Sequence, residues 1–108
     1  MTKKSLTPGQ RQTLEIIEEL GFGLIEGLSI FNGQPCYDHP PRIIQELKLA
    51  SGPEWRPDCH DVDLTLKKEF ENLFIQLGRL GNGVVDIEVH HCAPFRLVLE
   101  RSHKEFAP

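Results

Sequence analysis

Residues 64–101, LTLKKEFENLFIQLGRLGNGVVDIEVHHCAPFRLVLER, contain the strongest local signals in this chain. From Leu64 to Leu80 apolar side chains recur at helical spacing, and charged or amide side chains occupy most positions between them. Asp61 and Asp63 place negative charge near the helix start, where the dipole favours it, and Gly81 can adopt the left-handed conformation that ends a helix. The pattern predicts an amphipathic helix whose buried stripe is Leu66, Phe70, Leu73, Phe74, Leu77 and Leu80.

After this helix the apolar spacing changes to every second residue, which indicates two β-strands, each with one apolar face. If the connection were only His91 and Cys92, pairing would turn the two apolar sets to opposite faces. An odd-length or bulged turn is therefore expected, and it places Arg96 opposite Asp86 or Glu88 on the polar face. The apolar face expected for this hairpin is Val85, Ile87, Val89, Phe95, Leu97 and Leu99.

A helix is also expected near the N-terminus. Thr7-Pro8-Gly9-Gln10 is typical of a helix start, because Thr7 can serve as N-cap, Pro8 suits the first helical position and Gln10 completes a capping box. Gly21 is the expected end of this helix. Its buried side is predicted to be Leu14, Ile16, Ile17 and Leu20.

The first helix is followed by a second hairpin pattern. Leu24–Ile30 is a predicted strand interrupted by Gly27, and Asn32-Gly33 indicates a tight turn. The return strand should be brief, because Pro35 cannot donate to a strand ladder and Pro40-Pro41 ends the run.

The middle of the chain is less regular. Residues 42–50 fit a helix or a strand, and two adjacent β-branched residues in a short run favour the strand slightly. Residues 51–62 have the composition of a long loop, which is typical of mobile or functional segments. Trp55, the single tryptophan, either anchors this loop to the core or serves as an exposed contact residue.

The two helix-hairpin patterns align with each other. Leu20-Gly-Phe-Gly-Leu-Ile-Glu matches Leu80-Gly-Asn-Gly-Val-Val-Asp, and skipping Gly27 extends the match to Pro35 and Pro94. Gly27 is then the extra residue of a β-bulge. The alignment predicts an internal duplication, although helix-to-strand connections often reuse glycine in unrelated segments. The single domain is accordingly expected to consist of a first helix-hairpin unit (6–38), a linker segment and loop (39–62), a second helix-hairpin unit (63–101) and a tail (102–108).

Each unit has one apolar helix stripe and one apolar hairpin face, and a lone hairpin is only marginally stable in water. Joining the hairpins into one antiparallel sheet of four to five strands, with both helices on the same face, buries all these surfaces. The sequence therefore predicts a two-layer α+β fold. The uncovered face is expected to carry Glu26, Ser29, Asp86, Glu88, Arg96 and Val98.

Composition narrows the class of protein. The chain has 108 residues, enough for one domain spanning 1–108, and its net charge of -4 argues against a protein built to neutralise nucleic-acid phosphates. No apolar run approaches the roughly 20 residues of a membrane span, and the N-terminus lacks a signal-peptide pattern. Three cysteines without regular spacing suit a reducing compartment, so a cytoplasmic location is expected.

Each cysteine has a histidine nearby, and thiolate and imidazole are the ligands that zinc prefers. No Cys-x-x-Cys occurs, and a buried cysteine or a polar hairpin tip explains the same residues. The candidate zinc ligands are Cys36, His39, Cys59, His60, His91 and Cys92.

The sequence offers no catalytic arrangement. Cys59-His60-Asp61 holds the residue types of a cysteine nucleophile, but adjacency in sequence is not the required geometry. The expected function is a non-enzymatic interaction module without a cofactor, which binds a protein partner or a second copy through the open sheet face or a strand edge. The alternatives are a nucleic-acid-associated protein and a zinc protein. The candidate binding residues are Trp55, Asp86, Glu88 and Arg96.

Overall fold

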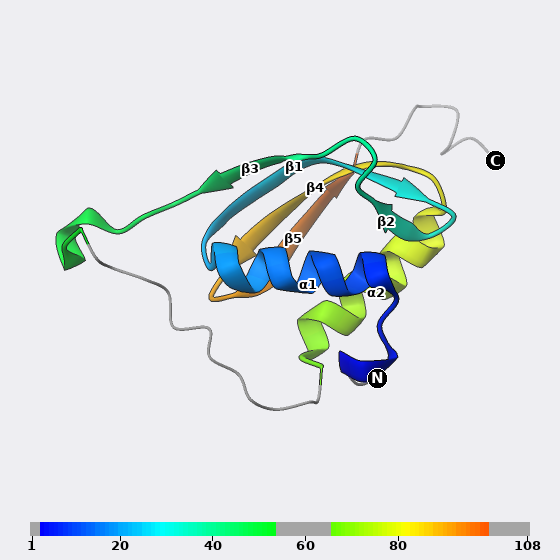
Figure 1. Ribbon diagram of the computed structural model, residues 1–108, viewed down its shortest axis with the longest axis horizontal. Coiled ribbons are helices and arrows are strands. Elements are labelled where there is room, and N and C mark those ends of the chain that lie inside the picture. The colour runs from blue at the N-terminus through cyan, green and yellow to red at the C-terminus, as the bar shows by residue number, and fades with distance from the viewer. Residues whose placement is uncertain (1–2, 54–65, 100–108) are drawn as a thin grey trace.

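The computed structural model describes residues 3–53 and 66–99, which form one helical layer packed on one antiparallel sheet (Figure 1). Both α-helices cover the same face of the five-stranded sheet, so the predicted α+β class and the two-layer arrangement are confirmed. The elements in chain order are η1 (Lys3–Ser5), α1 (Pro8–Leu20), β1 (Gly23–Phe31), β2 (Gln34–Cys36), β3 (Arg42–Gln45), η2 (Leu49–Ser51), α2 (Lys68–Leu80), β4 (Gly83–His90) and β5 (Ala93–Leu99).

The sheet is ordered β2-β1-β4-β5, and β3 also pairs with β1. β4 occupies one side of β1, so β2 and β3 share the other side: β3 pairs along Gly23–Glu26 and β2 along Ser29–Phe31. One edge of the sheet is therefore split between two short strands. The opposite edge is the single continuous strand β5.

The capping box predicted for α1 is present. The backbone N–H of Gln10 donates to Oγ1 of Thr7 at 3.2 Å, and the Thr7 N–H donates to Oε1 of Gln10 at 3.0 Å. Gly21, at φ 71°, ends the helix as expected. Thr13 joins the buried side with Leu14, Ile17 and Leu20, while Ile16 is only half-buried.

The second helix begins later than the sequence predicts. Its first residue is Lys68, so the expected start at Leu64 is wrong. Lys67 has an extended backbone with ψ 147°, which cannot continue a helix toward the N-terminus. Asp61 and Asp63 lie outside the described residues, and Glu69 and Glu71 supply the negative charge of the first turn.

The core lies between the two helices and the sheet. Leu66 belongs to it although it precedes α2, and Leu80 is only partly buried. Both halves of the chain contribute to this core. The apolar side chains in it with no exposed surface are Ile17, Ile25, Leu28, Leu77, Ile87 and Val89.

The β4–β5 hairpin has the predicted bulge, but one apolar residue lies where it was not expected. Val89 pairs with Pro94 and Glu88 with Arg96, so Phe95 is the extra residue. The bulge restores the register and places Arg96 opposite Glu88, as predicted. It also turns Phe95 away from the buried face, where the sequence pattern had placed it, and leaves that side chain 59% exposed.

Gly27 marks a second bulge, again as predicted. The register of β1 against β4 shifts between Ile25 and Leu28, and Gly27 has φ +78°, a conformation that favours glycine.

Equivalent positions of the two aligned units make matching contacts. Ile25 pairs with Ile87 and Leu28 with Val85, which is the exchange expected for a twofold relation. The backbone N–H of Gly33 donates to the Gly81 carbonyl, and the N–H of Cys92 donates to the Gly21 carbonyl, at 2.6 Å and 2.9 Å. Each bond joins a hairpin turn of one unit to the helix end of the other. A duplicated origin remains a prediction.

Residues 42–50 divide between two structures. The favoured strand interpretation is confirmed for Arg42–Gln45, which forms β3, and the chain then enters the short η2 helix. β3 and η2 project from the body of the molecule (Figure 1). The apolar side chains of Leu47 and Leu49 are exposed on this projection.

Candidate functional site

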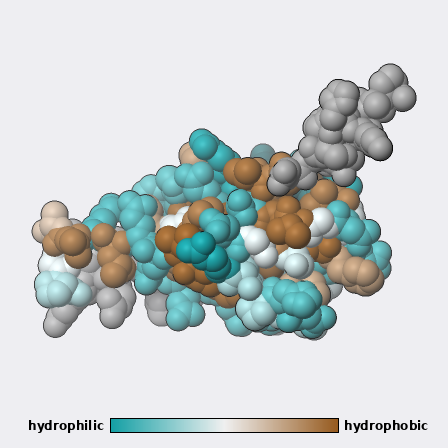
Figure 2. Space-filling view, turned by 90° about the horizontal axis from the view of Figure 1, so that it is seen from above, coloured by the Kyte–Doolittle hydropathy of each residue, from teal (hydrophilic) through white to brown (hydrophobic). Residues whose placement is uncertain are grey.

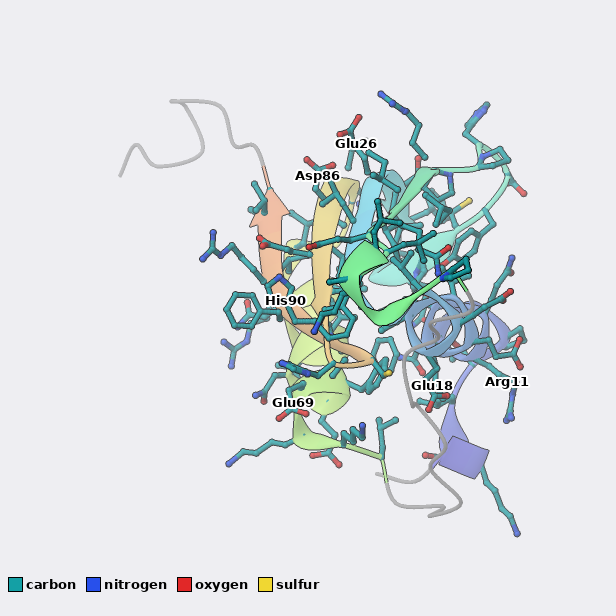
Figure 3. The ribbon with its side chains drawn as sticks, turned by 90° about the vertical axis from the view of Figure 1, so that its left-hand side faces the viewer. Arg11, Glu18, Glu26, Glu69, Asp86 and His90 are labelled. Atoms are coloured by element: carbon teal, nitrogen blue, oxygen red, sulfur yellow. The ribbon has the colours of Figure 1, made fainter. Side chains whose placement is uncertain are left out.

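The sheet face away from the helices carries charged residues, as expected. Arg96 stands opposite Glu88 and Val98 opposite Asp86, and Figure 3 shows Glu26 and Asp86 directed away from both helices. From the same side, hydrophobic patches interrupt a largely hydrophilic surface (Figure 2). A partner on this face could therefore contact charged groups and apolar groups together.

Asp86 has a structural role on this face. Its Oδ1 accepts the backbone N–H of Gly27 at 2.9 Å and so satisfies a donor that the β1 bulge leaves outside the strand ladder. Part of its hydrogen-bonding capacity is therefore already used within the protein.

Glu88 is the centre of a small cluster of polar side chains. Its Oε1 lies 3.2 Å from Nε2 of His90, and its Oε2 lies 3.7 Å from a guanidinium nitrogen of Arg96. The Arg96 side chain is 62% exposed. A surface pair at this distance is weak, so Arg96 retains the ability to bind a second carboxylate.

Aromatic rings lie beside the charges. The rings of His90 and Phe95 stack with centroids 4.4 Å apart, and Phe22 contacts His91 edge-on at 4.9 Å. The Arg96 guanidinium lies 5.6 Å from the Phe95 ring centroid. The bulge that exposes Phe95 therefore builds an aromatic surface at the β5 side of the sheet.

A groove runs between β5 and α2. It has a volume of about 200 Å³ and opens to solvent. Its lining combines an apolar floor with polar side chains: Glu69, Asn72, Leu73 and Gln76 from α2, and Pro94, Phe95, Arg96 and Leu97 from β5. Sequence reasoning missed this groove, because neither element alone indicates that the two lie side by side.

The outer edge of β5 is open over the described part of the chain. β5 is the last strand in the sheet order, and no strand within residues 3–53 and 66–99 pairs with that edge. In Figure 3, β5 and α2 form one side of the molecule.

The candidate zinc ligands do not come together where they can be placed. Cys36 pairs with Ser29 near one end of β1, while the Cys92 N–H binds the Gly21 carbonyl at the other end. Two such positions are roughly 25 Å apart at the usual rise of a strand, so these cysteines cannot share one ion. Among the described residues no three His, Cys, Asp or Glu side chains are grouped to hold a metal.

The two described cysteines also differ chemically. Cys36 carries a free thiol, whereas Cys92 is buried and disulfide-bonded. The cysteine count alone did not indicate this bond. Trp55, Cys59 and His60 lie outside the described residues, and so does the Cys59-His60-Asp61 sequence.

Comparison of the chain with protein-family models, with curated proteins and with solved structures finds no match. Within the described ranges, no helix has the length and apolar character needed to cross a bilayer. The structure defines a two-layer α+β protein with one sheet face uncovered by its helices. The same sheet has one open edge, with a groove beside it.

Proposed function

We propose that this chain is a non-enzymatic interaction module that binds an extended segment of a protein partner as an additional strand on the outer edge of β5. The observation that carries the proposal is the open edge of β5 beside the groove that α2 forms with it. Strand addition of this kind combines backbone hydrogen bonds for affinity with side-chain pockets for specificity.

The regular part of the edge sets the length of the bound segment. The bulge at Phe95 interrupts the ladder, so Arg96–Leu99 is the uninterrupted portion. Alternate residues of a strand direct both N–H and C=O to the same side, so two of these residues present their backbone groups outward. Each hydrogen bond formed there contributes about 0.5–1.5 kcal/mol net, and side-chain contacts must supply the remainder of the affinity.

The other edge of the sheet is less suited to this role. It is divided between β2 and β3, and Pro35 lacks an N–H to donate. Residues 37–41 separate the two strands, so no continuous ladder is offered to a partner.

Binding of single-stranded nucleic acid is the second candidate, because exposed aromatic rings can stack on bases. Phe95 and the stacked His90 would serve in this way. The carboxylates of Asp86 and Glu88 on the same face would repel phosphates, and this favours the peptide proposal. Measurable binding of an oligothymidylate that weakens steeply with added salt would reverse this ranking.

The proposal can be tested with a displayed library of random linear heptapeptides selected against the immobilised full chain. A selected peptide is then synthesised with a methyl group on one backbone nitrogen at a time. Strand addition requires alternate N–H groups, so affinity should fall at every second position and persist between them.

Nuclear magnetic resonance locates the same peptide on the protein. The amide signals of β5 should shift on titration, and those of β2 and β3 provide the internal control. A loss of affinity without the two-residue period, or shifts confined to β2 and β3, would overturn the proposal. Failure of the library to yield a binder would also count against it.

A further inference from the structure

We infer that the groove between α2 and β5 determines which segments bind, by accepting one large apolar side chain next to an acidic residue. This inference rests on the proposed strand addition at β5. A strand paired with β5 directs its side chains alternately to the helix side and to the open face of the sheet. The residue opposite Leu97 is on the helix side, because Leu97 pairs with the fully buried Ile87.

The groove suits an apolar side chain at that position. Leu73 is buried on the floor, Pro94 and Leu97 contribute further apolar surface, and polar side chains of α2 line the groove on the helix side. Its volume of about 200 Å³ exceeds that of an engineered cavity, about 150 Å³, that holds benzene. Leucine, methionine or phenylalanine would fill it, whereas alanine would leave most of it empty.

The neighbouring residue of the bound segment lies opposite Arg96 on the open face. The Arg96 guanidinium is exposed, and its partner Glu88 is shared with His90. A carboxylate from the segment would form a charge-assisted pair with Arg96, and a lysine would be repelled. The segment residue on the other side of the large apolar residue faces Val98, which is exposed. A β-branched side chain at that position would pack against Val98. Every strand pair in the sheet is antiparallel, so a segment added in the same way reads, from its own N-terminus, β-branched, large apolar, acidic.

Arg96 also disfavours a second copy of this chain as the occupant. Antiparallel pairing of two β5 strands centred on Arg96 would place the two guanidinium groups directly opposite each other. Pairing centred on Leu97 would place them on a diagonal about 7–8 Å apart. Both registers oppose like charges, whereas a foreign segment with a carboxylate is complementary.

The experiment uses the full chain and the probe peptide acetyl-Thr-Thr-Val-Leu-Glu-Thr-Thr-amide, whose glutamate faces Arg96 when its leucine faces Leu97 in an antiparallel pairing. Two variant peptides replace its leucine by alanine or its glutamate by lysine. For the native chain we expect each replacement to weaken binding, by about tenfold or more for alanine. Isothermal titration calorimetry provides the dissociation constants.

Matched protein variants assign each effect to its residue. Gln76→Trp fills the groove and should remove the preference for leucine over alanine, while Ile75→Trp, an exposed neighbour outside the groove, should retain it. Arg96→Glu should reverse the preference for glutamate over lysine, and Arg42→Glu on the opposite edge should not. Circular dichroism confirms that each variant is folded.

The possible failures are distinguishable. Equal binding of the leucine and alanine peptides, with the two-residue methylation period intact in library-selected peptides, would overturn the groove assignment and leave the proposed function standing. Absence of that period would overturn both. A concentration-dependent dimer whose formation shifts the β5 amide signals would identify a second copy as the occupant and overturn the inference.

Discussion

At the scale of single residues, one hydroxyl group of the first helix makes two contacts. Oγ1 of Thr7 accepts the N–H of Gln10 and donates to Oε1 of Gln34 at 2.7 Å. The first contact caps the helix, and the second joins the helix start to β2. Local sequence was sufficient to predict the cap, because its partners are only three residues apart. The contact with Gln34 spans 27 residues and required the fold.

Replacing Thr7→Ala should therefore lower the free energy of unfolding by about 1 kcal/mol, and by up to about 2 kcal/mol if both contacts contribute. Thr7→Ser keeps the hydroxyl and serves as the control. Urea denaturation measures the difference. An alanine variant as stable as the serine variant would contradict the assigned role of the hydroxyl.

Tyr37, the single tyrosine, hydrogen-bonds with the buried Thr13 at 2.5 Å. Burial raises the pKa of the Tyr37 phenol above its usual value of 10.0, and the hydrogen bond with Thr13 lowers it by less. In the unfolded chain the phenol loses its proton first. The contribution of Tyr37 to stability is therefore fully present below pH 10 and falls as the pH rises toward the folded pKa.

The ionisation of Tyr37 can be measured directly by phenolate absorbance, because the chain contains a single tyrosine. The phenolate absorbance of the folded chain should appear at a higher pH than that of the urea-unfolded chain. Above pH 10 the free energy of unfolding of Tyr37→Phe should fall less steeply with pH than that of the native chain. Titration of the lysines affects both proteins equally, so the difference reports Tyr37. An identical titration midpoint in folded and unfolded chains would exclude the predicted direction.

At the scale of elements, β3 depends on a close approach of two backbones. Gly23 lies at φ +152°, and a Cβ added there would overlap the carbonyl oxygen of Ile44. Gly27 also has a positive φ, but a Cβ there would meet open space. Comparing alanine substitutions at the two positions therefore distinguishes the effect of steric overlap from that of backbone strain.

Gly23→Ala should detach β3 from β1 while leaving β4 and β5 paired. We expect amide hydrogen exchange to accelerate across Arg42–Gln45, with protection retained in β4. Gly27→Ala should cost about 1 kcal/mol from strain without a selective effect on β3. Equal protection of β3 in both alanine variants would show that the overlap is relieved elsewhere.

At the scale of the whole molecule, the two helix-hairpin units share one core. β1 and β4 are neighbours, and the fully buried Ile17 and Leu77 come from different helices. Neither unit can keep its apolar face covered when the other unfolds. A single cooperative transition is the expected consequence.

Ile17→Ala and Leu77→Ala should each destabilise the protein by about 2–5 kcal/mol, and each should lower one common transition. Circular dichroism would follow thermal unfolding of the whole chain, and amide exchange in β1 and in β4 would report the first and the second unit separately. The exposed Ile75→Ala is the control and should have little effect. Two separate transitions, with only one shifted by each variant, would contradict a shared core.

The sequence by itself determined the features that depend on neighbouring residues: the α1 cap, the helix-ending glycines, the bulge at Gly27 and the need for a bulge in the second hairpin. It also determined the two-layer class, because complementary apolar faces leave few ways to be buried together. Tertiary structure decided the rest. Only packing of α2 beside β5 creates the groove, and only the actual register exposes Phe95. Only the strand order leaves β5 at an edge, since these properties depend on segments brought together by the fold and not on local sequence.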